Sequence, residues 1–273
     1  MATEYVGERN ADGLRHGQGT LTWASGASFS GGWDMDERHC EHGVQKEPDG
    51  RVYAGPWYRG RKQGPHGVFA WPNGSKYEGA WAADLRHGHG KQTEETGAVY
   101  VGDWLAGKKH GRGRFTFSSA ADAEPDAPHY YEGEFRFDAF WGYGKYVFSN
   151  GAVYEGRWAN NLRSGHGRQS EPDGRVYEGR WQFGMKSGFG KYTWPSGACY
   201  EGQWAGDVRH GRGRQVEADG VTVFDGDWAN GDFVGEVGND APSLFTGALL
   251  FDECDGAVGP AAAAAAAHAG AVA

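Results

Sequence analysis

The stretch that decides the fold is YEGAWAADLRHGHGKQTEETG, residues 77–97. Its first five residues alternate in character, so Tyr77, Gly79 and Trp81 share one face of a strand and the residues between them take the other. A short polar turn leads into His-Gly-x-Gly and a second strand, and pairs such as Asn-Gly or Asp-Gly precede the next unit. The stretch therefore predicts one β-hairpin.

The same pattern, aromatic-x-Gly-x-Trp, recurs along the chain, and we number its occurrences copies 1 to 10. Successive copies begin 23 or 24 residues apart, except for one step of 31 residues between copies 5 and 6. A lone hairpin is only marginally stable in water, so each hairpin must stack on the next. This fixed period indicates a repeat architecture. The copies begin at Tyr5, Phe29, Tyr53, Tyr77, Tyr100, Tyr131, Tyr154, Tyr177, Tyr200 and Phe224.

The amino-acid composition agrees with such a repeat. Of 273 residues, 48 are glycine, without the every-third-residue spacing of collagen. Each copy uses about four glycines, where an aromatic ring needs space or the backbone must bend. Aliphatic residues are scarce, isoleucine is absent, and 12 Trp and 13 Tyr supply apolar material. We therefore expect a thin aromatic core distributed along the repeat.

Charge and cysteine content exclude several classes of function. The formal net charge of −9 gives no basic surface for nucleic acid and predicts only weak attraction to anionic membranes. Cys40, Cys199 and Cys254 are scattered outside any C-x-x-C motif, so they predict neither a disulfide framework nor a zinc site. The N-terminal residues lack an apolar signal segment and no stretch approaches a membrane span, so we expect a cytoplasmic protein.

Several copies resemble MORN repeats, the membrane occupation and recognition nexus motif. The units are YEGAWAADLRHGHG, YVGDWLAGKKHGRG, YEGRWANNLRSGHG, YEGRWQFGMKSGFG and YEGQWAGDVRHGRG, and the resemblance covers residues 5–235. It implies an all-β fold, an elongated single-layer antiparallel sheet of about ten hairpins, which is a non-globular, solenoid-like ribbon with an aromatic groove. Copy 1 departs from the pattern with Arg9 in place of Trp, and copy 6 has Phe135 there and Trp141 in place of His.

The second strands of the copies fall into two kinds. Apolar copies carry two apolar residues on one strand face, and glutamine copies carry Gln and Glu there. The kinds alternate along the chain except at copies 5 and 6, which are adjacent apolar copies. The apolar pairs are Leu21 and Trp23, Phe69 and Trp71, Phe115 and Phe117, Tyr146 and Phe148, and Tyr192 and Trp194; the polar pairs are Gln45 and Glu47, Gln92 and Glu94, Gln169 and Glu171, and Gln215 and Glu217.

The alternation slips at the one long insertion, and this position divides the chain. We assign MORN repeats 1–5 to residues 1–117, an inserted loop to residues 118–129 and MORN repeats 6–10 to residues 130–235. Residues 236–260 contain the aliphatic cluster SLFTGALLFDE and are expected to cap the last strand. Residues 261–273 are rich in alanine and are expected to be disordered.

The sequence carries no catalytic motif, and we predict that the chain is not an enzyme. It has no nucleophile signature, and its Gly-x-Gly pairs enter strands without a following helix, which argues against a phosphate-binding loop. Neither a cofactor nor a metal is expected. Six histidines are interpreted as occupying one repeat position, which would place them roughly 10 Å apart, too far to share a metal. They are His16, His42, His66, His87, His110 and His210.

Two rows of residues are candidates for a partner-binding face. The tryptophans either form only the core or leave part of an aromatic face open to an apolar helix or peptide. The glutamates of the glutamine copies either lie on a solvated face or, alternating with aromatic strands, form periodic docking sites. Both alternatives stay open at this point. The candidate residues are Trp81, Trp104, Trp158, Trp181, Trp204, Glu47, Glu94, Glu171 and Glu217.

The segments EYVGERNADGLRHGQG and YEGAWAADLRHGHG are similar to segments of the radial spoke head MORN proteins of motile cilia. That resemblance implies a non-catalytic structural subunit of the axoneme of a cilium or flagellum, within the cytoskeleton. Its partners would be other radial spoke head proteins, together with a second copy of the chain in a homodimer. The alternative is a cytoskeletal or membrane-associated scaffold that binds anionic phospholipids. Nucleic acid is not expected as a partner.

Overall fold

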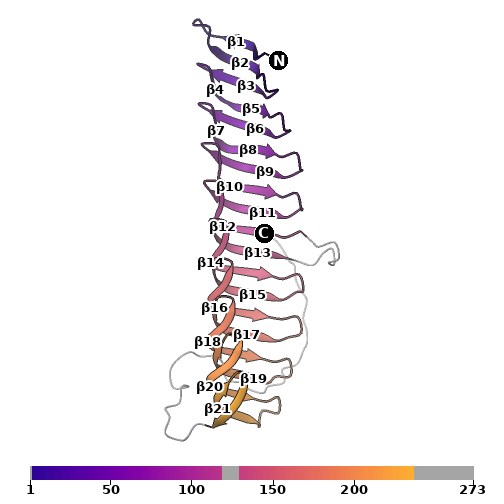
Figure 1. Cartoon of the computed structure of the whole chain (residues 1–273), viewed down its shortest axis with the longest axis vertical. Helices are drawn as coiled ribbons and strands as arrows, with labels where there is room; N and C mark the ends of the chain where they lie inside the picture. The colour runs from indigo at the N-terminus through magenta and orange to yellow at the C-terminus, as the bar shows by residue number, and fades with distance from the viewer. Residues whose placement is uncertain (1, 119–128, 237–273) are drawn as a thin grey trace, which may run out of the picture.

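The computed structural model describes residues 2–118 and 129–236, and all of its strands belong to one antiparallel sheet. The sheet is a single layer in which the hairpins follow one another in chain order along one axis, with the twist usual for strands (Figure 1). This arrangement confirms the all-β, non-globular ribbon predicted from the sequence. Most of the predicted inserted loop, the capping segment after residue 236 and the Ala-rich tail lie outside the described residues.

Each copy contributes one hairpin of the ribbon. Copies 2 and 3 have an interrupted second strand, which brings the described strands to 22. The strands are β1 (Glu4–Arg9), β2 (Arg15–Thr22), β3 (Ser28–Asp34), β4 (Glu37–Arg38), β5 (Cys40–Lys46), β6 (Val52–Tyr58), β7 (Arg61–Lys62), β8 (Gly64–Ala70), β9 (Lys76–Ala82), β10 (Leu85–Thr93), β11 (Val99–Leu105), β12 (Lys108–Thr116), β13 (Tyr130–Arg136), β14 (Ala139–Val147), β15 (Val153–Ala159), β16 (Leu162–Ser170), β17 (Val176–Gln182), β18 (Met185–Thr193), β19 (Cys199–Ala205), β20 (Val208–Val216), β21 (Val223–Ala229) and β22 (Asp232–Glu236).

The first and last residues of the aromatic-x-Gly-x-Trp pattern lie on one face of the ribbon, which we call the front face. Strand register places Gln92 opposite Tyr77 on one side and Tyr100 on the other, so the Gln and Glu rows share this face. Glycines pair with glycines from strand to strand, as Gly79 with Gly90 and Gly90 with Gly102. The front face therefore consists of a central glycine row flanked by rows of large side chains.

The glycine row exists because the tyrosine rings lie on it. A Cβ atom on Gly90 would stand 2.3 Å from the Tyr77 hydroxyl oxygen, and one on Gly79 would stand 2.5 Å from the Gly90 Cα. The Tyr77 hydroxyl donates a hydrogen bond of 2.9 Å to the carbonyl oxygen of Ala80. That carbonyl lies where the register of the hairpin shifts, so the phenol satisfies a backbone acceptor at the bulge.

The tryptophans join successive hairpins into one aromatic core. The Trp104 ring meets the Tyr100 ring of its own copy and the Tyr77 ring of the preceding copy edge-on, each at a centroid separation of 5.2 Å. Edge-to-face pairs of this kind add about 0.5–1.5 kcal/mol each beyond the burial of apolar area. The same relation recurs along the ribbon, so no hairpin has a core of its own. The core is continuous and one side chain thick.

A bulge in the second strand of each hairpin decides which glycines need a left-handed backbone. In copy 4, Gly88 has a φ of +59°, whereas Gly90 lies in the regular ladder beneath the Tyr77 ring. The two glycines of the His-Gly-x-Gly motif thus have different tasks. In copies 2 and 3 the additional residue of the 24-residue repeat lies in this bulge, between Cys40 and Gly43 and between Gly64 and Gly67.

The opposite, back face carries a ladder of alternating charges in copies 5 to 9. Register places Arg114 against Glu132, then Lys145, Glu155 and Arg168 on successive strands. Arg114 Nη1 lies 3.6 Å from a Glu132 oxygen, and both side chains are at least half exposed. Such exposed pairs contribute little stability and keep this face solvated. Aromatic rings on the front face are therefore the more distinctive surface for a partner.

Candidate partner-binding face

An arginine at the start of the second strand fastens each glutamine copy to the next hairpin. Arg86 Nη1 donates to the Gln92 side-chain oxygen at 2.5 Å, and Nη2 donates to the Gly107 carbonyl in the next turn at 2.8 Å. The guanidinium carbon lies 4.2 Å from the centre of a Trp104 ring. Burial lowers the pKa of Arg86. The arginines with these three contacts are Arg38, Arg86, Arg163 and Arg209.

The glutamine extends this contact to the rim of the face. Gln45 is 7% exposed, accepts from Arg38 and donates to a Glu47 oxygen at 3.2 Å. Gln169 and Gln215 make the matching bonds to their glutamates. Gln45 is therefore buried rather than solvated, whereas the glutamines of the other copies are half-buried. In copies 2, 7 and 9 the glutamine thus links the arginine to a half-buried carboxylate by successive hydrogen bonds.

The apolar copies 3, 5 and 8 use a lysine at the same position. The Lys62 ammonium lies 4.9 Å from the centre of the Phe69 ring and 5.2 Å from that of the Trp81 ring. Its backbone N–H donates to an Asp84 side-chain oxygen at 2.9 Å, and the Asp84 N–H donates back to the Lys62 carbonyl at 3.0 Å. Burial lowers the pKa of Lys62. Lys109 with Asp138 and Lys186 with Asp207 repeat these backbone contacts.

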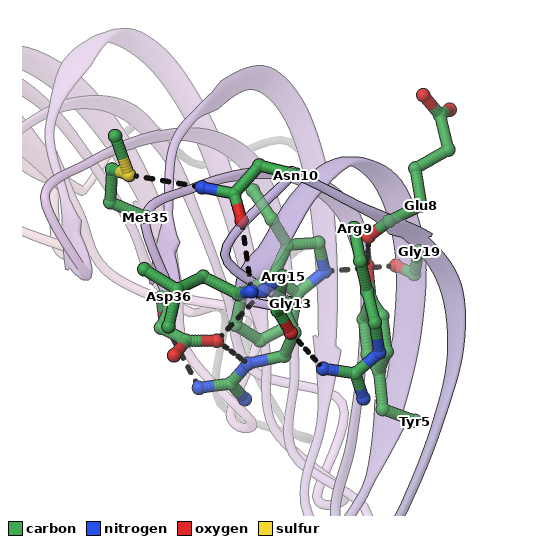
Figure 2. A network of polar contacts seen from close by, with 11 residues as sticks. Tyr5, Glu8, Arg9, Asn10, Gly13, Arg15, Gly19, Met35 and Asp36 are labelled. Carbon is green, nitrogen blue, oxygen red and sulfur yellow. Dashed lines mark hydrogen bonds and ion pairs between the residues drawn. The ribbon is translucent and has the colours of Figure 1, made fainter.

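The residue that these contacts reach in the next turn therefore differs between glutamine copies and apolar copies. Glutamine copies are followed by glycine, whose carbonyl accepts from the arginine, and apolar copies are followed by Asp or Asn at positive φ. Copy 1 is apolar but carries an arginine, and its Arg15 pairs with the Asp36 side chain at 2.8 Å (Figure 2). Copy 6 has Phe140, whose N–H donates to the Asn161 side chain at 2.7 Å.

The first hairpin differs from the others at the tryptophan position. Arg9 occupies the tryptophan position, lies 4.9 Å from the Tyr5 ring centre and donates to the Gly13 carbonyl at 2.6 Å (Figure 2). A charged side chain here removes the ring that would pack against a preceding hairpin. A charged side chain on an edge strand opposes pairing of that strand with another chain.

The predicted tryptophans are almost wholly covered by their own sheet. Trp81, Trp104, Trp158, Trp181 and Trp204 are 3–7% exposed, so they offer a partner little indole surface. The predicted glutamates lie at the rim and are half-buried. Whether either row binds a partner stays a prediction. A half-buried aromatic row lies next to the tryptophans and consists of the apolar pairs found in the sequence, which were expected to alternate with the glutamates but were not named as candidate residues.

The histidines do not all share one position, contrary to the sequence interpretation. His87 precedes the left-handed Gly88, but His42 and His66 precede Gly43 and Gly67, which belong to the regular glycine row. The extra bulge residue causes this offset. Among residues 2–118 and 129–236, no group of three or more His, Cys, Asp or Glu side chains is placed to hold a metal ion. The same residues include no helix that could cross a bilayer.

The front face is hollowed where the alternation of copies slips. A groove of about 660 Å³ runs along the ribbon from Phe117 of copy 5, across Tyr146 and Phe148 of copy 6, to Glu171 of copy 7. The Tyr146 ring lies at its centre, 4.4 Å from the Phe148 ring and 5.5 Å from the Phe117 ring. We call this depression the junction groove.

The fold and front face define a repeat protein of the single-layer β-hairpin class. The MORN repeat family matches residues 11–28, 53–76, 77–97, 100–119, 131–153, 154–174, 177–199 and 200–222, together more than half of the chain. The chain belongs to the MORN repeat family. Copies 2 and 10 lie outside the matched residues, although their strands continue the same sheet.

Comparisons with individual proteins add little to this result. No curated protein matches the chain. Among solved structures, the TCP domain of Drosophila melanogaster SAS-4 is 11% identical, with a TM-score of 0.35, over 60% of this chain and 85% of that one. The TCP10 domain of Danio rerio CPAP is 15% identical, with a TM-score of 0.34, over 74% of this chain and 89% of that one. Likeness at this level says nothing about function.

Proposed function

We propose that the chain is a non-catalytic scaffold of the motile cilium or flagellum, a radial spoke head subunit that holds protein partners on its front face. The observation that carries the scaffold role is the junction groove on a ribbon whose hairpins are locked to one another. Rigid, largely preformed sites bind with little loss of conformational entropy. The assignment to the spoke head draws its support from the similarity of residues 4–19 and 77–90 to radial spoke head MORN proteins.

The cations of the front face support a protein partner over a lipid surface. Arg86 and Lys62 lie over aromatic rings and bond to their own chain, and burial lowers the pKa of each. Attraction to anionic lipid requires basic groups that reach the headgroups. The front-face cations are instead used within the ribbon, while its rim presents carboxylates.

The test is to purify axonemes from the protein's own cells and to follow the tagged full-length chain. We expect it to remain with the axoneme and to co-purify with radial spoke components. Recovery with a membrane or basal cytoskeletal complex would contradict the proposal. A second measurement, co-sedimentation of the purified chain with vesicles rich in phosphatidylserine at physiological salt, should show little binding; strong binding would favour the lipid alternative.

A further inference from the structure

The junction groove is the one place on the described front face where two apolar copies adjoin. Elsewhere each apolar second strand is flanked by glutamine second strands. Here β12 carries Phe115 and is followed directly by Phe117, and β14, the next second strand along the ribbon, carries Tyr146 and is followed directly by Phe148. The aromatic floor is therefore twice as long as in any other described copy.

Copy 6 lacks the internal cation that the other apolar copies around it place over their rings. In copy 5, at the near end of the junction groove, the Lys109 ammonium lies 4.2 Å from the centre of the Phe115 ring. In copies 3 and 8 a lysine ammonium lies within about 5 Å of the second-strand ring. In copy 6 that place is filled by Phe140, which stacks on Tyr131 at 3.8 Å and meets Trp158 edge-on at 5.6 Å. The floor is a cluster of rings that includes His129, which stacks on the Phe117 ring at 4.1 Å and lies within hydrogen-bond distance of the Tyr146 hydroxyl at 2.9 Å.

Charge differs between the two ends of the junction groove. At the copy 5 end, the Glu94 carboxylate lies 3.7 Å from Lys109. At the copy 7 end, one Glu171 oxygen accepts from Gln169, and the described residues show no hydrogen bond to the other. Arg163 is engaged by Gln169, by the Gly184 carbonyl and by the Trp181 ring at 4.1 Å. An occupant is therefore favoured if it is apolar over copies 5 and 6 and basic over copy 7.

The distance between second strands of successive copies favours one backbone conformation of the occupant. Second strands of successive copies are two strands apart, roughly 9.6 Å. A polyproline II helix rises about 9.3 Å per turn of three residues and presents every third side chain on one side. An α-helix returns to the same face after each turn of about 5.4 Å, and two turns of seven residues cover about 10.5 Å, which matches the step less closely. A β-strand covers the step in about three residues, which places successive side chains on opposite faces.

We propose that the junction groove binds a proline-rich partner segment in the polyproline II conformation, with apolar residues at every third position followed by Arg or Lys. The two apolar residues lie on the rings of copies 5 and 6, and the basic residue pairs with Glu171. Aromatic-lined grooves favour this conformation because it loses little entropy on binding. This inference rests on the proposed scaffold function and specifies the chemistry of the partner.

The experiment titrates the full-length chain with the synthetic peptide PPLPPLPPR, blocked at both ends, by isothermal calorimetry. We expect saturable binding with a Kd below about 1 mM and binding weaker by about tenfold for PPLPPLPPE. Phe148→Lys and Glu171→Lys should each weaken binding by about tenfold. Trp194→Lys and Glu217→Lys change the matching residues of copies 8 and 9 and should leave binding unchanged. Near-ultraviolet circular dichroism checks that each variant is folded.

Several results would overturn the proposal. These are no saturable binding, equal affinity for the arginine and glutamate peptides, equal loss in the copy 8 and 9 variants, or binding only by an amphipathic helical peptide with leucines and arginine at heptad spacing. A failure of the proposed scaffold function is recognised by a different result from a failure of the peptide proposal. If no protein co-purifies from cells, that function fails, whereas partners that bind wild type and Phe148→Lys equally would leave it standing and place them elsewhere.

Discussion

The Trp104 indole N–H donates a hydrogen bond to the Gly90 carbonyl oxygen at 3.2 Å, so the ring that fills one hairpin is bonded to the hairpin before it. The bond spans 14 residues and two copies. Because each hairpin contributes to its neighbour's core, stability is shared between adjacent copies rather than held within one. The same bond is made by Trp33, Trp81, Trp158, Trp181, Trp204 and Trp228.

Trp104→Phe tests the hydrogen bond apart from the ring. The phenyl ring keeps most of the edge-on contacts but removes the donor, so we expect a loss of about 1–3 kcal/mol in the free energy of unfolding. Trp104→Ala also opens a cavity and should cost about 3–5 kcal/mol. Chemical denaturation followed by circular dichroism measures both. A Trp104→Phe variant as stable as the wild type would show that the indole N–H contributes nothing.

Arg86→Lys tests the arginine contact of the glutamine copies. Lysine cannot reach the Gln92 oxygen and the Gly107 carbonyl together in the planar geometry of a guanidinium, so we expect a loss of about 1–3 kcal/mol. Converting the whole junction with Arg86→Lys, Gln92→Phe and Gly107→Asp should recover part of that loss, because it rebuilds the arrangement of copy 3. A triple variant less stable than Arg86→Lys alone would contradict this account of the alternation.

Substitutions at Gly90 and Gly97 test two separate reasons for glycine: lack of space for a side chain at Gly90, and a left-handed backbone at Gly97. Gly90→Ala drives a methyl group into the Tyr77 ring and should cost about 3 kcal/mol or more. Gly97 has a φ of +88° and open space around its missing Cβ, so Gly97→Ala should cost only the left-handed strain, about 1–2 kcal/mol. Thermal unfolding of the two variants gives the comparison. The reverse order of stabilities would rule out the ring as the cause of the glycine row.

The buried tyrosines predict loss of structure in alkali. Burial raises the pKa of Tyr77 to about 12, from an ordinary 10.0. Between these values the folded chain holds more protons than the unfolded chain, so the stabilisation is complete below pH 10 and is lost as pH rises toward 12. Burial also raises the pKa of Tyr53, Tyr100, Tyr131, Tyr154, Tyr177 and Tyr200.

Phenolate absorbance and circular dichroism, recorded together across pH 9 to 13, measure this effect, with the chain in denaturant as the control for ordinary phenols. We expect ionisation of the buried tyrosines to coincide with the loss of the sheet. Ionisation of all tyrosines near pH 10 with the dichroism unchanged would contradict their burial.

The period-2 alternation of Tyr77, Gly79 and Trp81 is sufficient to predict the strand, the hairpin and the front face, because a sheet face repeats every second residue. The prediction that rings lie over glycines is confirmed by the contact of Tyr77 with Gly90. These features are local or recur at a fixed period. They need no knowledge of which side chains meet across copies.

The contacts between copies were not predictable in the same way. Gln92 alone indicates a polar surface, but its partner Arg86 lies six residues earlier and its neighbour Gly107 belongs to the next turn. The signal was present as a covariation within the chain, since arginine, glutamine and glycine occur together where lysine, an apolar residue and aspartate otherwise stand. The junction groove depends on the three-dimensional meeting of copies 5, 6 and 7, which no single copy specifies.

The central claim is that protein partners bind the front face, and comparative co-purification from the protein's own cells tests it most directly. The front-face variant carries Phe148→Lys and Glu171→Lys, and the back-face control carries Val101→Lys and Tyr143→Lys at two exposed positions. Axonemal partners are quantified against the tagged wild-type chain. We predict that the front-face variant loses most of its partners while the back-face variant keeps them; retention by the front-face variant, with loss in the back-face variant, would contradict the account.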